Sequence, residues 1–180
     1  DSSYNSETYP ISISAALGSS TTNTLTIKPA AGQTPAFSGS FANPFLFMGN
    51  TASNIIIDGS NQVGGTSRDL SFANSDGSFS GNGLYILGSN ITVKNVAISA
   101  TGVGTALRLD DIGTNVVVDN CAFAPVTGSL RWAIAAGATV PNIPGPTVTN
   151  NQFTQALGTA IETYNMSGSV IRGNSMDQSD

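Results

Sequence analysis

Histidine is absent from the sequence, and cysteine is nearly so. Without histidine the chain can form no Ser-His-Asp or Cys-His nucleophile system and no imidazole metal site. The single cysteine, Cys121, excludes an intrachain disulfide framework, and its place in an apolar repeat predicts a buried, unreactive thiol. No run approaches the roughly 18 apolar residues of a membrane-spanning helix, so we expect no membrane insertion.

Charge is also scarce. Charged residues make up 9% of the 180 residues, with 6 Lys and Arg against 11 Asp and Glu and a net charge of -5. Because the chain carries no basic stripe, we do not expect nucleic acid as a partner. A hydrophobic fraction of 39% argues against disorder, and 20 glycines among many serines, threonines and asparagines favour short strands joined by turns.

The sequence contains one short repeat that occurs four times. Its apolar residues alternate, as in strands with one buried face. Aligning the copies predicts two inward columns, the first with spacings of 25, 30 and 23 residues, which are typical of repeat architectures. The copies are 90-NITVKNVAI-98, 115-NVVVDNCAF-123, 145-GPTVTNNQF-153 and 169-SVIRGNSM-176; the columns are Val93, Val118, Val148 and Ile171, and Ile98, Phe123, Phe153 and Met176.

A second segment with alternating apolar residues precedes each copy of the repeat. Strands that stack turn on turn in the same direction form a parallel β-helix. We therefore predict an all-β fold, a single-stranded, right-handed parallel β-helix (solenoid) of roughly six or seven turns that forms one domain over residues 1–180. The second strands are 83-GLYIL-87, 104-GTALRLDD-111, 131-RWAIAA-136 and 158-GTAIETY-164.

Less regular segments extend this assignment. Residues 1–22 are expected to be an N-terminal cap or a first strand, because only 9-YPISISA-15 alternates within them. We place Ile57 and Phe72 in the first inward column with Val93, so that the stretches 60–68 and 75–83 become Gly- and Ser-rich loops. In the last two copies an inward Asn ladder is predicted, formed by Asn151 and Asn174.

Several motifs resemble a known group. The segments 54-NIIIDGSNQVGGTSRDLSFAN-74 and 104-GTALRLDDIGTNVVVDNCAF-123 resemble right-handed parallel β-helix regions of large secreted or surface proteins of Bacteroidetes-type bacteria. The resemblance implies a secreted or cell-surface location and a chain that is a segment of a longer exported protein. The broader pectate-lyase-like β-helix class also includes polysaccharide-degrading enzymes, and fold alone does not decide between these roles.

Acidic and basic residues supply the candidate chemistry. Glycoside hydrolysis would need two carboxyl groups at one cleft, and Asp110 and Asp111 are the adjacent pair. A lyase-like reaction would instead need Lys94 or Arg108 as its base. Oxygen ligands for Ca²⁺ would come from four aspartates, Asp58, Asp69, Asp111 and Asp119. Each group also has a structural interpretation. Asp110 and Asp111 suit a turn, Lys94 and Asp119 suit a cross-strand ion pair, and Asp58 precedes a glycine as in many turns. We therefore expect no catalytic site and no cofactor, with Ca²⁺ as the alternative.

Aromatic residues supply the candidate binding surface. Tyr85, Trp132 and Tyr164 lie in the second strands of different turns. Facing outward they would form a platform for sugar rings, and facing inward they would belong to the core, which is the assignment we favour for Trp132.

The residues that follow the first inward column point outward and do not share one type of side chain. They are Lys94, Asp119, Thr149 and Arg172. This favours a non-enzymatic structural or adhesive module of an exported bacterial surface protein, self-associating end to end, with glycans or other copies of itself as partners. The alternative is a polysaccharide-active, lyase-like or carbohydrate-binding β-helix that acts on acidic glycans.

Overall fold

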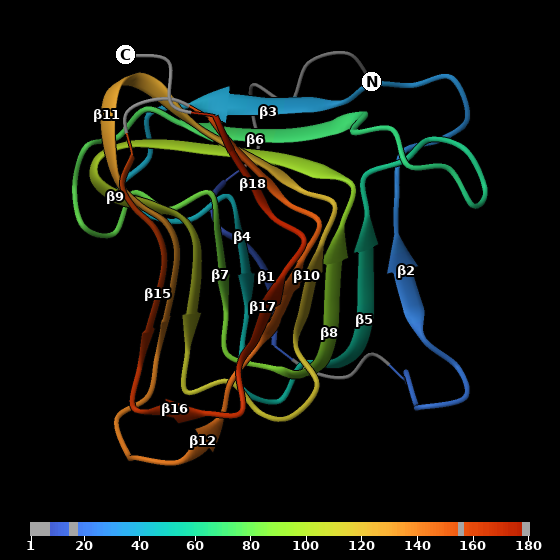
Figure 1. The fold of residues 1–180 in the computed structure, drawn as a ribbon. Coiled ribbons are helices and arrows are strands. Elements are labelled where there is room, and N and C mark those ends of the chain that lie inside the picture. Colours follow the sequence, from blue (N-terminus) through green and yellow to red (C-terminus); the bar gives the residue numbers. More distant parts are fainter. Residues whose placement is uncertain (1–7, 15–17, 155–156, 178–180) are drawn as a thin grey trace.

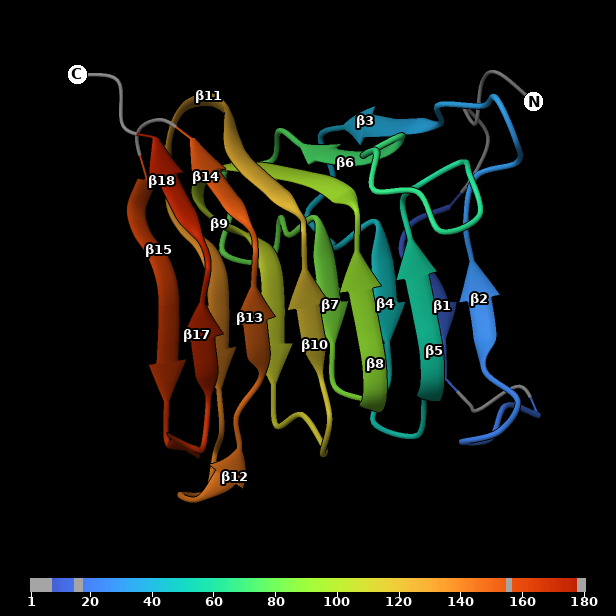
Figure 2. The same ribbon diagram turned by 45° about the vertical axis from the view of Figure 1, so that its right-hand side comes forward.

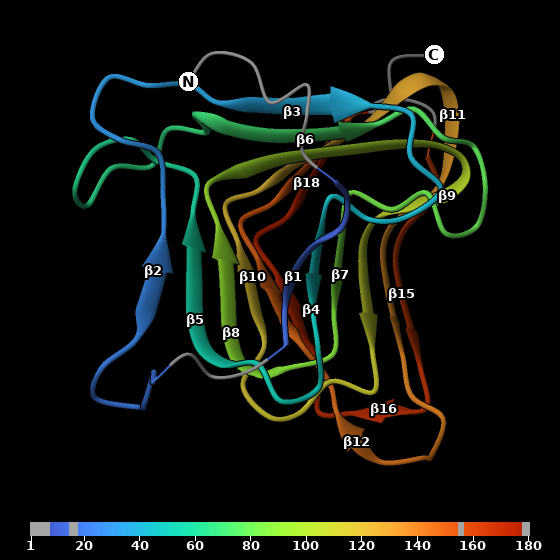
Figure 3. The same cartoon turned by 180° about the vertical axis from the view of Figure 1, so that it is seen from behind.

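The computed structural model describes residues 8–14, 18–154 and 157–177, whose regular secondary structure is entirely β-strand. The strands form a three-sided solenoid, and we name its sides the first, second and third faces. Figure 1 looks into the solenoid, and in Figure 3 the first face stands on the left, with β3 and β6 across the top and β15 on the right. The predicted all-β parallel solenoid is confirmed.

The first face is a parallel sheet of six strands, one from each turn. Six strands in one sheet correspond to about six turns, and Figure 2 shows them side by side. In spatial order they are β2 (Leu25–Ile27), β5 (Ser53–Asp58), β8 (Ser89–Lys94), β10 (Val117–Asp119), β13 (Thr147–Thr149) and β17 (Val170–Arg172).

The second and third faces belong to one bent sheet, because two long strands cross both of them. These are β9 (Val96–Asp110) and β11 (Ala122–Gly137). Their first halves lie on the second face with β3 (Ala36–Gly39), β6 (Leu70–Asn74), β14 (Gln152–Thr154) and β18 (Ser175–Asp177). Their second halves lie on the third face with β1 (Ile11–Ile13), β4 (Leu46–Met48), β7 (Leu84–Ile86) and β15 (Leu157–Tyr164). A short pair joins β12 (Ile143–Pro144) and β16 (Met166–Ser167).

Both predicted inward columns are confirmed by the strand register. Their members are buried until the last described turn, where Ile171 is 49% exposed and Met176 is 63% exposed. Side chains of the three faces meet in one core, and Phe123 and Phe153 stack within it with ring centroids 5.2 Å apart. Volume and apolarity are thus constrained at these positions, as a dry and densely packed interior requires.

One column assignment is wrong. Ile57 pairs with Val93 on the first face as predicted, but Phe72 pairs with Ile98 on the second face. The reason is that Ile57 and Phe72 belong to the same turn of the solenoid. The loop 60–68 carries the chain around a corner between them, so their strands lie on different faces.

The N-terminal segment contributes a strand. Within the alternating stretch 9–15, Ile11–Ile13 form β1, which pairs in parallel with β4 on the third face. The rest of the predicted cap falls partly on residues 1–7 and 15–17, which lie outside the described residues.

Asparagine shapes the corners of the solenoid. Asn95, Asn120 and Asn150 have positive φ angles of 58°, 48° and 56° between the first and second faces. Asparagine tolerates this left-handed conformation better than most residues, which explains its recurrence. The predicted inward ladder is confirmed, because Asn151 Nδ2 donates to Asn174 Oδ1 at 3.0 Å. A further contact of this kind, from Asn120 Nδ2 to Asn95 Oδ1 at 2.8 Å, was not predicted.

Candidate functional site

The structure places Lys94 on the first face, opposite both Asp58 and Asp119 in register. Its ammonium forms an ion pair with Asp58, with Nζ 3.2 Å from Oδ2. The predicted partner, Asp119, instead accepts hydrogen bonds from Thr149 Oγ1 at 2.7 Å and Asn150 Nδ2 at 2.8 Å. The predicted Lys94–Asp119 pair is therefore wrong, because Asp119 turns towards the hydroxyl and amide of the next turn.

Asp58 and Asp69 organise the corner loop 60–68. Asp58 Oδ1 accepts hydrogen bonds from Asn95 Nδ2 at 2.7 Å and Ser60 N at 3.1 Å, and Asp69 Oδ2 accepts one from Asn61 N at 2.9 Å. Burial raises the pKa of Asp58, but the hydrogen bonds and the Lys94 ammonium outweigh burial, so its pKa is lowered overall. Hydrogen bonds from Asn61 and Ser67 likewise lower the pKa of Asp69. Both side chains act as loop-closing carboxylates.

The four calcium candidates are not brought together. Asp58 and Asp119 lie on the first face, Asp69 lies in the corner loop, and Asp111 follows β9. Within the part of the chain that the structure describes, no three His, Cys, Asp or Glu residues cluster in a way that could hold a metal ion.

Adjacent aspartates at the end of β9 take different directions. Asp111 has a φ of 43°, which agrees with a turn at this residue, but its carboxylate accepts hydrogen bonds from Thr139 N at 2.6 Å and Thr139 Oγ1 at 2.9 Å rather than from its own backbone. Asp110 is the last residue of β9 and not part of the turn. Asp110 Oδ2 accepts hydrogen bonds from Tyr85 Oη at 3.0 Å and Arg108 Nε at 2.6 Å on the third face. They form no carboxylate pair facing one substrate.

Around Arg108 the outer surface of the third face carries a continuous line of rings and guanidinium groups, which we name the aromatic–arginine strip. The ring centroids of Phe47 and Tyr85 lie 5.4 Å apart, and Arg108 Cζ lies 5.0 Å from the Tyr85 centroid and 4.6 Å from that of Phe79. The line then continues edge-to-face from Phe79 to Trp132 at 6.1 Å and ends at Arg131, whose Cζ lies 4.0 Å from the Trp132 centroid. Its members are Phe47, Tyr85, Arg108, Phe79, Trp132 and Arg131.

Strand register builds the first half of this strip. Phe47 stands opposite Tyr85, and Tyr85 stands opposite Arg108, so the three share one outward column with a spacing of about 4.8 Å per turn. The residues flanking each of them along its strand point inward and are buried. A column of rings therefore follows from the alternation of strands β4, β7 and β9.

The second half of the strip depends on a loop. Phe79 lies between β6 and β7, in the Gly- and Ser-rich loop 75–83, and is 50% exposed. It inserts between Arg108 and Trp132, which belong to successive turns. Trp132, which we expected in the core, is only half-buried and contacts Phe79 and Arg131 at the surface.

Two of the three predicted aromatic residues thus belong to the strip. The third, Tyr164, pairs in register with Gly137, is 65% exposed and lies outside the strip. Phe47, Phe79 and Arg131 were not predicted from the sequence. The alternation around Phe47 could have revealed it, whereas nothing in a polar loop sequence indicates where Phe79 points.

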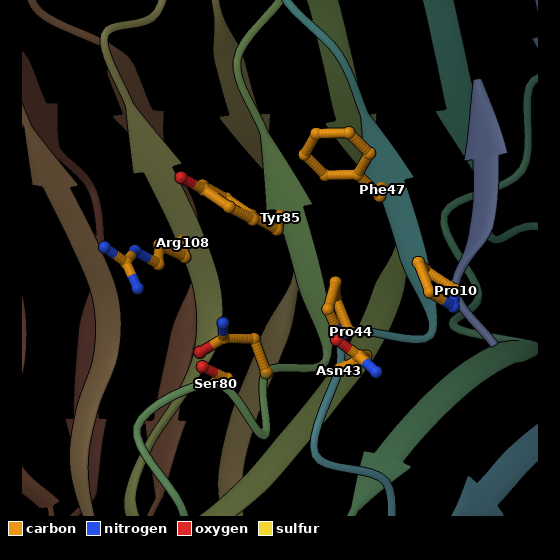
Figure 4. Close-up of a pocket in the computed structure, with 8 residues that line it drawn as sticks. Pro10, Asn43, Pro44, Phe47, Ser80, Tyr85 and Arg108 are labelled. Atoms are coloured by element: carbon orange, nitrogen blue, oxygen red, sulfur yellow. The ribbon is translucent and has the colours of Figure 1, made fainter. Parts of the chain in front are cut away.

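A pocket of about 260 Å³ adjoins the strip. Figure 4 shows Phe47, Tyr85 and Arg108 on neighbouring strands beside it, with Pro10 and Pro44 near Phe47. Burial raises the pKa of the Tyr85 hydroxyl, and the neighbouring Asp110 carboxylate raises it further. The hydroxyl is therefore neutral at neutral pH. The arrangement offers apolar walls and hydrogen-bonding groups. Among the residues that the structure describes, the pocket is lined by Pro10, Asn43, Pro44, Phe47, Ser80, Asn82, Tyr85 and Arg108.

The chain matches no family model, no curated protein and no solved structure. In the described residues, no helix has the length and apolar character needed to cross a membrane.

Proposed function

We propose that this chain is a non-enzymatic, adhesive β-solenoid module that binds a glycan through the aromatic–arginine strip. The observation that carries the proposal is the unbroken series of ring and guanidinium contacts from Phe47 to Arg131 on an outer face. Aromatic rings offer flat apolar surfaces to the C–H faces of sugars, while convergent polar groups bind their hydroxyls. The sheet beneath the strip positions all of its members except Phe79, which joins them from the loop 75–83.

The proposal includes a setting. We assign the module to a secreted or surface-located protein of a Bacteroidetes-type bacterium. This assignment is supported by the order of three motifs in the sequence: Ile-Asp-Gly (57–59) at the end of β5, Gly-Gly-Thr (64–66) in the following loop, and Arg-Asp-Leu (68–70), which leads into β6.

The alternative is a lyase-like enzyme acting on acidic glycans, which would need Lys94 or Arg108 as the base beside a bound substrate. Lys94 lies on the first face and is paired with Asp58, whereas Arg108 and Asp110 lie on the third face and bind each other. Each candidate base is thus engaged by an aspartate, which supports binding without turnover.

Affinity electrophoresis through gels containing neutral and acidic polysaccharides tests the proposal. We expect retardation by at least one glycan, and Tyr85→Ala should weaken binding about tenfold because a stacking ring worth roughly 1.4 kcal/mol is lost. Tyr164→Ala is the matched control, since it removes an exposed tyrosine outside the strip. Incubation with polygalacturonate or alginate and Ca²⁺ should give no rise in absorbance from unsaturated uronates.

Two outcomes would contradict the proposal. Equal losses in Tyr85→Ala and Tyr164→Ala would move binding away from the strip. Release of unsaturated uronates would replace the adhesive function with the enzymatic one.

End-to-end self-association is a second candidate function, favoured by apolar side chains in the first and last turns that the structure describes. In the last described turn, the column members Ile171 and Met176 are exposed. In the first described turn, the same columns contain Ile27 and Phe37, which line a pocket of about 810 Å³. A second copy stacked there would continue both columns with side chains of similar size.

Sedimentation velocity over a range of concentrations tests this second candidate. We expect larger species at high concentration and their loss in Ile171→Lys, because a charge would enter the stacked core. Val63→Lys changes a loop valine that is 99% exposed and serves as the control. A wild-type chain that stays monomeric at every concentration would contradict the candidate.

A further inference from the structure

The pocket beside Phe47 and Tyr85 contains polar groups but little net charge. Of the described residues that line it, Arg108 alone is charged. That charge is offset by Asp110, whose Oδ2 lies 2.6 Å from Arg108 Nε. The Arg108 and Asp110 side chains are 23% and 25% exposed, so water screens the pair incompletely.

We infer that this pocket binds an uncharged sugar unit and that the ligand of the module is a neutral glycan. The inference rests on the proposed function and names its ligand class. Pro10, Pro44, Phe47 and Tyr85 supply apolar walls for the face of a sugar ring. A pocket of about 260 Å³ suits one sugar unit of a longer chain rather than several.

Hydroxyl groups of such a sugar would find donors and acceptors around the rim. Asn43 and Ser80 line the pocket, and their side chains can both donate and accept hydrogen bonds. The Arg108 guanidinium has five N–H groups, of which the Nε–H is bound to Asp110. The remaining Arg108 N–H groups can donate to sugar oxygens. The Tyr85 hydroxyl donates to Asp110, which fixes the ring orientation.

A carboxylate in the same position would be disfavoured. It would lie near Asp110, whose negative charge already binds Arg108 and Tyr85, and it would compete with Asp110 for the guanidinium. The net charge of -5 adds a weak repulsion for any polyanion at low salt. The Asp110 carboxylate and the net negative charge therefore both favour the uncharged member of any pair of otherwise identical glycans.

Paired polymers with the same backbone provide the test. We would measure binding to dextran and carboxymethyl-dextran, to cellulose oligosaccharides and their C6-oxidised uronates, and to methyl-esterified and free polygalacturonate. We expect the uncharged member to bind more tightly in each pair that binds at all, with an affinity that does not change between low and high salt.

Asp110→Asn sharpens the test, because the amide keeps an oxygen for the Tyr85 hydroxyl but frees the Arg108 charge. We expect this variant to gain about tenfold in relative affinity for the acidic member of a pair, a change of about 1.4 kcal/mol. Glu162→Gln, which makes the same kind of carboxylate-to-amide change at an exposed position of β15 outside the strip, should leave the preference for uncharged sugars unchanged. Thermal unfolding of both variants verifies that they fold.

The outcomes separate the inference from the function on which it rests. Tighter binding of the acidic member, or no change of preference in a folded Asp110→Asn variant, overturns the neutral-glycan inference while leaving glycan binding intact. Absence of binding in all pairs overturns the proposed function itself.

Discussion

Asp58 is a buried carboxylate, 7% exposed, that serves three donors in two turns of the solenoid. Replacing it by asparagine removes the ion pair with Lys94 and weakens the hydrogen bonds from Asn95 and Ser60. We expect Asp58→Asn to lower the free energy of unfolding at about pH 7 by roughly 1–3 kcal/mol. Urea denaturation measures this difference, and Asp177→Asn, which alters an exposed carboxylate, should change stability by less than about 0.5 kcal/mol.

The pKa of Asp58 determines how the stability difference between the wild type and Asp58→Asn depends on pH. Although burial raises the pKa of Asp58, the bonds from Asn95, Ser60 and Lys94 lower it overall in the folded state. A lowered folded pKa means that the stabilisation is complete above the ordinary Asp value of about 3.9 and is lost as the pH falls through the folded pKa. The gap between the wild type and Asp58→Asn should therefore narrow below about pH 4. A gap that widens on acidification would contradict this assignment.

Cys121 is fully buried, with its sulfur 3.6 Å from Val93 O and 3.5 Å from Asp119 O. Burial raises the pKa of this thiol to about 12, so it stays protonated over the neutral range. Since the thiolate is the reactive species, we expect no labelling by a disulfide reagent near pH 8 in the folded protein and one thiol per chain after denaturation. Rapid labelling of the folded chain would show that this part of the core opens.

At the scale of elements, the corner after β5 requires a glycine. A Cβ on Gly59 would collide with the carbonyl oxygen of Asn95 in the next turn, and Gly59 N donates to Lys94 O at 2.9 Å. The two backbones cannot separate without losing that hydrogen bond. We expect Gly59→Ala to lower the free energy of unfolding by about 3 kcal/mol.

Gly77 supplies the matched control for this corner. It has no positive φ, and a Cβ there would meet nothing within 4 Å. Gly77→Ala should therefore change stability by less than about 0.5 kcal/mol in the same chemical denaturation. Equal effects of the two substitutions would mean that the corner relaxes and that stacking of the turns is looser than the structure indicates.

Alternation and register made the strands and inward columns predictable from sequence, because a one-residue slip would turn every core side chain outward. Corners were harder to predict. Phe72 was assigned to the wrong column because a nine-residue loop, 60–68, hides the fact that two faces share one turn. The place of Phe79 in the strip was also not predictable: Phe47, Tyr85 and Trp132 lie in strands, but Phe79 reaches Arg108 from a loop whose course no periodicity encodes.

At the scale of the whole molecule, Arg68 links turns that are not neighbours. It extends from the corner loop after β5 to the corner after β10, where Nε donates to Asn120 O at 2.8 Å and Nη2 donates to Asn120 Oδ1 at 3.0 Å. Its Nη1 continues to Gln152 Oε1 at 3.2 Å in the following turn. Most contacts in a solenoid join adjacent turns, whereas this side chain joins three turns and skips the turn of β8 between the first two.

We therefore expect Arg68→Ala to reduce cooperativity as well as stability. The free energy of unfolding should fall by about 1–3 kcal/mol, since hydrogen bonds from a charged donor are lost. Hydrogen exchange should accelerate in β10 and β13 more than in β2. Arg68→Lys should not restore protection, because one ammonium lacks the planar fork that reaches both Asn120 and Gln152. Arg172→Ala, at an exposed position on β17, is the control. Uniform acceleration in all strands would show that Arg68 stabilises the solenoid without coupling its turns.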